Sequence, residues 1–205
     1  MQHTMFGNAM LVLLVFFKAT GARNHHHYDN NLCFHGSSKV QLEGGTMRKL
    51  EEVRVGDRIL TANFQKEVSY KPVIFMPHAA NSKESVFRTV RTRSALLHVT
   101  SLHLLQDCHD GKFVQANKII PNDTCLSVIN GNETATSISI SIKKGTSTVI
   151  TENELVVVNG FIASPFSYSH AIPGAFYRFM MAVIPTSNLD LILQGITETF
   201  GPLIL

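Results

Sequence analysis

Residues 33–42 read CFHGSSKVQL, and residues 50–60 read LEEVRVGDRIL. They place a cysteine thiol at the start of a series of β-strand signals. Further along, residues 100–103 read TSLH, which adds a threonine and a histidine three residues apart. A cysteine side chain can attack the carbonyl carbon of the residue before it through a five-membered ring. These residues together predict chemistry at the peptide bond Leu32–Cys33.

Signals for β-strands recur from residue 33 to about residue 164, with few helical stretches between them. Gly44-Gly45, Gly56-Asp57 and Asp110-Gly111 predict turns, because glycine permits a tight turn and aspartate favours one. We interpret Asp57 as a turn residue without a catalytic role. Short strands separated by turns are typical of a compact all-β domain. The expected strands are residues 40–42, 58–62, 68–76, 86–90, 95–100, 112–114, 125–129, 138–143 and 155–163.

The pattern changes from strands to helices after residue 166. Residues 175–184 predict a short helix with few polar positions, and Pro185 ends it. A second helix is expected from residue 189 to about residue 200. We therefore expect a β domain over residues 33–166 and a tail of two apolar helices over residues 167–205. The apolar positions at helical spacing in the second helix are Leu189, Ile192, Leu193 and Ile196.

The N-terminus has the pattern of a secretory signal. Residues 10–17 form a short apolar core and residues 19–22 are small, which predicts a signal peptide over residues 1–22. The alternative is a buried N-terminal strand or helix. We expect a secreted, extracellular protein in which residues 23–32, a polar linker, precede Cys33. The released product would be a short peptide unless further sequence lies upstream.

Bulk composition narrows the function classes. The chain has 205 residues, 44% of them hydrophobic and 16% charged, with a net charge of +3. This is the composition of one ordinary globular domain, with or without a tail. Because there is no block of lysines and arginines, we expect no nucleic-acid partner. The three adjacent histidines at 25–27 lie in the polar linker, where nothing fixes a metal geometry, so we expect no metal site.

The chain contains three cysteines, an odd number, so at least one is free or pairs between chains. That count suits a reactive Cys33 better than a disulfide scaffold. We interpret Cys108 as a loop cysteine, the alternative being a nucleophile beside His109. Cys125 lies in an apolar strand and is interpreted as a core residue.

Thr100 and His103 suit the chemistry that Cys33 needs. An amide is a poor electrophile and an amine a poor leaving group, so the site must strain the amide and protonate the departing nitrogen. Thr100 supplies a hydroxyl for the strained amide, and His103 can give the proton. A Thr-x-x-His pair alone more often marks a core histidine with a capping threonine. Its meaning here comes from its combination with the Cys33 segment.

These motifs resemble the autoprocessing domain of hedgehog and hedgehog-related proteins, the Hint domain, which shares its fold with inteins. The resemblance covers residues 33–166 and includes VTSLHL at 99–104 and VVVN at 156–159 leading into Ala163-Ser164. It implies the compact Hint β fold with a short C-terminal helical extension. Residues 169–184 resemble the first helix of the sterol-recognition extension of hedgehog proteins.

The resemblance implies a two-step reaction in a cell-cell signalling protein. Cys33 would form an internal thioester with Leu32, assisted by Thr100 and His103. A sterol hydroxyl, with cholesterol as co-substrate and no other cofactor, would then release the upstream peptide as an ester. The family's usual aspartate for the sterol step falls at Pro77, and His78 beside it is the candidate base, the alternative being an exposed loop histidine.

Two other positions depart from the family pattern, and they leave alternatives open. Pro165 stands where hedgehog proteins have a cysteine, and Leu32 stands where the family usually has glycine. One alternative is a non-catalytic secreted binding module with the same fold, and another is self-cleavage by water without a lipid. Splicing is disfavoured because Asn159 follows Val158 and precedes Gly160. Expected partners are the chain's own upstream peptide, a sterol, and a membrane surface contacted by the C-terminal helices.

Overall fold

The computed structural model describes residues 33–78, 84–153, 155–167, 171–185, 188–189 and 191–195, and at residues 78, 167, 172 and 173 it describes the backbone only. The expected signal peptide (1–22), the upstream segment (23–32) and residues 196–205 lie outside the described residues. Predictions about those segments therefore stay predictions.

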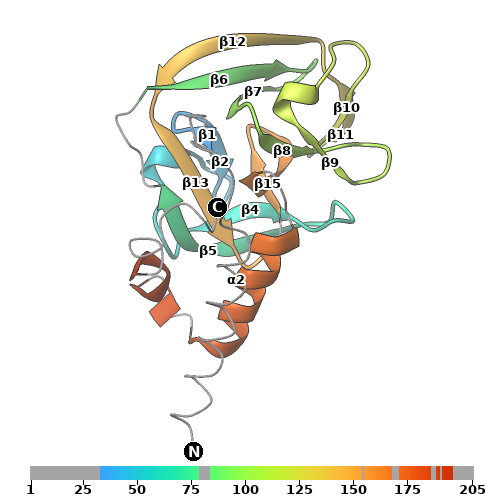
Figure 1. Ribbon diagram of the computed structural model, residues 1–205. Coiled ribbons are helices and arrows are strands. Elements are labelled where there is room, and N and C mark those ends of the chain that lie inside the picture. The colour runs from blue at the N-terminus through green and yellow to red at the C-terminus, as the bar shows by residue number, and fades with distance from the viewer. Residues whose placement is uncertain are drawn as a thin grey trace, which may run out of the picture.

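The described strands pair antiparallel; nearly half of the pairings join chain neighbours, as turn-separated strands predict, and the others join distant segments. One sheet holds 13 of them, and a separate hairpin joins the other two. Figure 1 shows β12 (Ser137–Lys144) running across the top and β13 (Thr146–Thr151) descending through the centre. The chain bends between these two strands at Gly145, whose φ is 92°. The strands are β1 (Phe34–His35), β2 (Lys39–Gln41), β3 (Met47–Lys49), β4 (Arg58–Ala62), β5 (Val68–His78), β6 (Glu84–Arg91), β7 (Leu96–Thr100), β8 (His103–Gln106), β9 (Phe113–Gln115), β10 (Cys125–Val128), β11 (Gly131–Thr134), β12 (Ser137–Lys144), β13 (Thr146–Thr151), β14 (Leu155–Val158) and β15 (Phe161–Ser167).

The main core lies where β1, β7, β13 and β15 converge. Strands β4, β7, β14 and β15 contribute apolar side chains to it, and the cluster includes Phe34 beside the predicted nucleophile. Every residue of β13 is buried, because this strand lies between β1 and β5 inside the sheet. Cys33 is therefore built into the centre of the domain.

The predicted turns and hairpins are confirmed. The hairpin expected from residues 86–90 and 95–100 is β6 paired with β7, and the Asp110-Gly111 turn joins β8 to β9. The Asp57 carboxylate accepts a hydrogen bond from the Arg54 backbone N–H at 2.8 Å and pairs with Arg48 at 2.9 Å. Asp57 is thus a structural turn residue, as expected.

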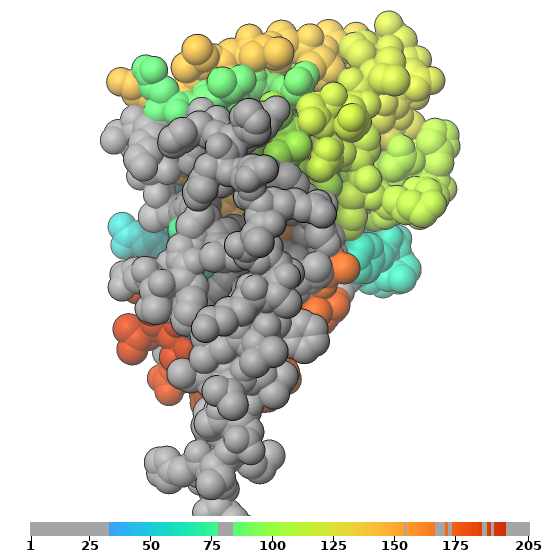
Figure 2. All heavy atoms as spheres, viewed as in Figure 1, coloured from blue at the N-terminus to red at the C-terminus, as the bar shows by residue number. Residues whose placement is uncertain are grey.

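Strand β12 is an edge of the large sheet. In Figure 2 the β6–β12 ribbon forms the upper rim of the molecule. Ile140 and Ile142 on β12 are exposed, and Lys143 and Lys144 follow them at the end of the strand. Lysines at an exposed edge discourage pairing with another chain.

The first tail helix, α2 (Ala171–Val183), begins four residues before the expected start at 175. Phe176, Tyr177 and Met180 pack with Phe166 of β15 in a second buried cluster, and the Tyr177 ring stacks on Phe166 with centroids 5.6 Å apart. Residues 191–195 are helical, within the second helix expected. Leu189 and Leu193 join the same cluster, so the tail completes a core. Neither helical segment is long and apolar enough to span a membrane within the described part of the chain.

Candidate active site

Cys33 lies one residue before β1, between β7 on one side and β13 on the other. Its side chain is fully buried, and it is the free cysteine of the chain. Phe34 pairs in register with Val99 of β7 and with Ser147 of β13. Continuing this antiparallel register by one residue sets Cys33 opposite Thr100 and opposite Thr148. The two flanking strands therefore fix the nucleophile.

Thr100 holds Cys33 by two hydrogen bonds. The Cys33 backbone N–H, which belongs to the peptide bond Leu32–Cys33, donates to the Thr100 Oγ1 at 3.0 Å. The Thr100 backbone N–H donates to the Cys33 carbonyl oxygen, also at 3.0 Å. Thr100 is 5% exposed, so water does not compete for these bonds. The predicted contact between Thr100 and the amide is present.

His103 begins β8 and is completely buried. Its ring packs edge-on against Phe34, with ring centroids 4.1 Å apart. Among the described residues neither ring nitrogen has a hydrogen-bond partner of good geometry. The structure therefore brings His103 to the residue next to Cys33, with the Ser164 backbone close to its ring.

Burial keeps both reactive groups neutral. It raises the pKa of the Cys33 thiol to about 11, although the Thr148 and Thr146 hydroxyls act in the opposite direction. Burial also lowers the pKa of His103 to about 3, opposed in part by the backbone of Ser164. Desolvation disfavours the charged form of each group. At pH 7 the resting site therefore holds a thiol and a neutral imidazole.

Thr146 and Thr148 of β13 were not predicted as site residues. Both hydroxyls are buried and lie beside the Cys33 thiol. The signal in the sequence is the run Thr146-Ser147-Thr148 directly after Gly145, since hydroxyl side chains at alternate positions of a strand share one face. A strand that is buried throughout, yet carries hydroxyls, indicates a polar task inside the core.

The positions where the family pattern places residues for a second step lie on β5 and β15. Pro77 and His78 end β5, and the His78 backbone pairs in register with Thr148. The His78 side chain lies outside the described residues, so its role as a base stays a prediction. Pro165 lies where the register of β15 shifts against β8, between Ala163 opposite Leu105 and residue 167 opposite His103. A strand tolerates proline at such an irregularity.

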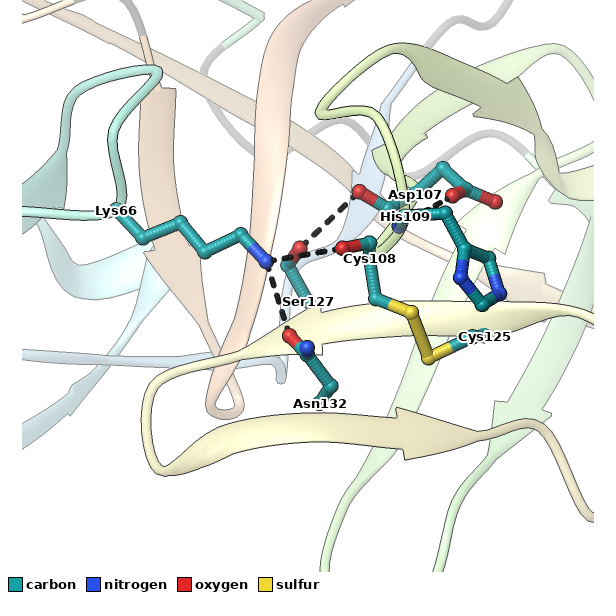
Figure 3. The surroundings of a disulfide bond; sticks show 7 residues. All are labelled: Lys66, Asp107, Cys108, His109, Cys125, Ser127 and Asn132. Atoms are coloured by element: carbon teal, nitrogen blue, oxygen red, sulfur yellow. Dashed lines mark hydrogen bonds between the residues drawn. A yellow bond between two sulfur atoms is a disulfide. The ribbon is translucent and has the colours of Figure 1, made fainter.

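The interpretation of Cys108 and Cys125 was wrong in one respect. They form a disulfide, with Cα atoms 5.4 Å apart, although one was expected to be an unpaired loop residue and the other a core residue. Figure 3 shows the bond and its support: the Lys66 ammonium donates to the Cys108 carbonyl oxygen and to the Asn132 side chain. The loop of residues 107–112 folds back onto β10, which sequence spacing alone does not reveal. His109 lies beside this pair, but the sulfurs bond each other and are not available as metal ligands.

Asn159 has a structural role. Its φ is 49°, and its side chain accepts a hydrogen bond from the Lys39 backbone N–H at 2.6 Å and donates to the Leu96 carbonyl at 2.7 Å. The asparagine therefore fixes the β14–β15 turn against β2 and β7. The prediction that it does not serve as a splicing asparagine stays a prediction.

Several solved structures share this fold. An intein-like domain from Clostridium thermocellum is 16% identical, with a TM-score of 0.55 over 65% of this chain and 98% of that one. A DnaB intein from Synechocystis sp. PCC 6803 is 12% identical, with a TM-score of 0.54 over 64% and 96%. A DnaX mini intein from Spirulina platensis is 14% identical, with a TM-score of 0.52 over 64% and 98%. At these identities the likeness establishes the fold, and the expected Hint architecture is confirmed.

The model of one protein family, the Hint module, matches residues 22–173. Together with the fold, this match supports autoprocessing, by splicing or by cleavage, as the general class of activity. The resemblance to hedgehog proteins in particular stays a prediction. The match spans most of the chain and includes every residue discussed above around Cys33, so this chain belongs to the Hint module family.

Proposed function

We propose that this domain cuts its own chain at the peptide bond Leu32–Cys33 through a thioester on Cys33. The observation that carries the proposal is the pair of hydrogen bonds by which Thr100 holds the Cys33 nitrogen and carbonyl oxygen, both at 3.0 Å. An acyl shift from nitrogen to sulfur requires a free thiol next to the bond that breaks. It also requires a buried group, here the Thr100 hydroxyl, that is hydrogen-bonded to the nitrogen of that bond.

In the first step the Cys33 sulfur forms a bond to the Leu32 carbonyl carbon, and the bond from that carbon to the Cys33 nitrogen breaks. The thiol loses its proton and the departing nitrogen gains one, so no oxidant, reductant or metal is needed. His103 carries this proton, since a neutral imidazole can accept one at one nitrogen and donate from the other. Its low pKa supports this shuttle, because a buried imidazolium returns its proton readily.

In the second step a hydroxyl attacks the thioester, releases the upstream peptide and restores the Cys33 thiol. The hydroxyl belongs to water or to a sterol such as cholesterol, and we assign His78 as the base. The backbone pairing of His78 with Thr148 supports this assignment. The hollow beneath α2, lined by Phe166, Tyr177 and Met181, is about 20 Å³ and holds about one water molecule. This hollow is too small for a sterol, so a sterol would have to displace α2 or bind elsewhere.

We also propose that the protein is secreted and needs no cofactor. The Cys108–Cys125 disulfide supports this location, because disulfides persist in oxidising compartments. Phe179, Val183 and Leu191 of the tail are exposed apolar residues, which supports contact between the tail and a membrane surface. The upstream peptide is then both substrate and product.

The test uses the full chain with a folded tag inserted between residues 22 and 23, produced in a secreting cell line. Purified protein is incubated with dithiothreitol, with cholesterol, or with neither, and is examined by gel and mass spectrometry. Cleavage at Leu32–Cys33 is expected with dithiothreitol, and Cys33→Ala is expected to stay intact. A sterol adduct on the released fragment would identify transfer, and an unmodified acid would identify hydrolysis. Native protein that stays as intact as Cys33→Ala under every condition would overturn the proposal and favour a non-catalytic binding module.

A further inference from the structure

Thr148, Cys33 and Thr100 form a row across three adjacent strands. The register of β1 with β13 and with β7 sets Cys33 between the two threonines on one face of the sheet. The next row of the same face holds Thr146, His35 and His98, since His35 pairs with Thr146 and its ring lies 5.8 Å from that of His98. Two hydroxyls of β13 therefore lie on the face that carries the Cys33 sulfur.

These two hydroxyls have no structural task in the described fold. Thr146 and Thr148 are 0% and 1% exposed, and neither Oγ1 has a hydrogen-bond partner of good geometry among the described residues. A buried hydroxyl that lacks a partner costs free energy. Two such groups beside one thiol indicate that they serve the Cys33 sulfur in a state other than the resting thiol.

No cation among the described residues supports the thiol. Among the described groups, burial raises the pKa of Cys33, the Thr148 and Thr146 hydroxyls lower it, and no charged side chain contributes. The nearby imidazoles are occupied elsewhere: His35 Nδ1 contacts the Ser37 hydroxyl at 2.6 Å, and His98 Nδ1 contacts the Thr89 hydroxyl at 2.8 Å. His103, the remaining titratable neighbour, packs against Phe34.

We propose that Thr146 and Thr148 form a hydroxyl pair that donates hydrogen bonds to the Cys33 sulfur when it carries negative charge. The proposal deepens the self-cleavage function and rests on it. Sulfur is anionic twice: when it attacks the Leu32 carbonyl carbon, and when it leaves the thioester in the second step. At both points the pair replaces the cation that usually stabilises a reactive thiolate. The proton lost by sulfur goes to His103 in the first step and returns from the base in the second.

The test replaces each hydroxyl by a methyl group of the same shape, as Thr148→Val, Thr146→Val and the double variant. Dithiothreitol-induced cleavage is expected to slow about tenfold for one substitution and about a hundredfold for both. The unfolding midpoint should stay equal or rise, because a buried hydroxyl without a partner is removed. Thr148→Ser is expected to restore the rate. Thr151→Val is the matched control, since the Thr151 hydroxyl bonds the Asn153 carbonyl at 3.1 Å instead.

A second readout is independent of cleavage. Protein labelled with ¹³Cβ-cysteine is titrated by NMR, where Cys33 alone responds because the other two cysteines form a disulfide. With a pKa of about 11, about a tenth of the thiol is ionised at pH 10. The double valine variant should show about a thousandth, because the loss of both hydroxyls is worth about a hundredfold. If the double valine variant ionises to the same extent as wild type, the proposed role of the hydroxyl pair is overturned. The same holds if wild type cleaves and the double variant cleaves at an equal rate. Failure of the wild-type chain to cleave, with the NMR shift still present, would overturn only the self-cleavage proposal.

Discussion

Replacing Thr100 by valine removes one hydrogen-bond acceptor and almost no volume. The acceptor is the Oγ1 atom that holds the Cys33 N–H at 3.0 Å. Thr100 and Cys33 are 5% and 0% exposed, so water cannot replace the lost partner. The Thr100 backbone bond to the Cys33 carbonyl is untouched, and the strand pairing is therefore retained.

The size of the effect of Thr100→Val depends on whether the Cys33 nitrogen is neutral or protonated. A buried peptide N–H without a partner costs about 1–3 kcal/mol, so the free energy of unfolding should fall by that amount. During cleavage the same nitrogen becomes a protonated amine, and a charge-assisted hydrogen bond is roughly twice as strong as a neutral one. The transition state therefore loses about 1 kcal/mol more than the ground state. Cleavage should slow by about fivefold.

Stability is measured by urea unfolding in a Cys33→Ala background, where no cleavage interferes, and the rate by gel after addition of dithiothreitol. Thr100→Ser keeps the hydroxyl and should cleave near the wild-type rate. Thr92→Val removes a buried hydroxyl that bonds the Ala95 backbone N–H at 3.2 Å in a remote turn, so it should cost stability without slowing cleavage. Cleavage by Thr100→Val at or above the wild-type rate would show that this bond protects the amide rather than helping to break it.

Three further predictions concern stability. Because burial lowers the pKa of His103 from 6.5 to about 3, the unfolded chain binds a proton below pH 6.5 that the folded chain refuses. The free energy of unfolding therefore falls as pH drops from 6.5 toward 3, by about 2 kcal/mol at pH 5. His103→Leu should remove this part of the acid sensitivity, measured by urea unfolding, and should abolish cleavage. Replacing Cys108 and Cys125 together by serine should cost about 3 kcal/mol for a loop of this length, while a cleavage rate equal to wild type is expected at low temperature. Tyr177→Ala should cost about 3–5 kcal/mol because the ring stacks on Phe166 in the buried tail cluster, and a thermal melt unchanged by it would show that the tail does not complete the core.

Most of the strands were predictable because they depend on local patterns, whereas the contact between Cys33 and Thr100, 67 residues apart, was expected from the chemistry of the two side chains and from the resemblance to the Hint domain. Alternating apolar residues and the short turn between Thr92 and Ala95 determine β6 and β7, and β7 places residue 100 beside residue 33. The cysteine, threonine and histidine also have distinctive chemistry, so few other functions suit the combination. His103 was found for that reason, although nothing in its own segment revealed that it is fully buried.

The contacts that were not predicted all depend on pairings between distant segments. The hydroxyls of Thr146 and Thr148 have meaning only once β13 lies beside β1, which joins residues more than 110 positions apart. The disulfide likewise needs the loop after β8 to fold over β10. The spacing of residues in the sequence does not reveal that β13 lies beside β1 or that the loop after β8 contacts β10. The early start of α2 has a similar cause, since packing against Phe166 extends the helix beyond its own apolar pattern.

The position of these contacts explains how one cut can leave the fold intact. The Phe34 side chain, the β1 pairings and the Cys33 carbonyl bond to Thr100 all lie on the C-terminal side of the bond that breaks. The one described contact on the breaking bond itself, from the Cys33 nitrogen to Thr100, remains available to the new amine. All of these described contacts are therefore kept when the bond breaks. The barrier to cleavage lies in forming charge on a buried thiol and a buried imidazole, and the groups that lower that barrier are hydroxyls rather than cations.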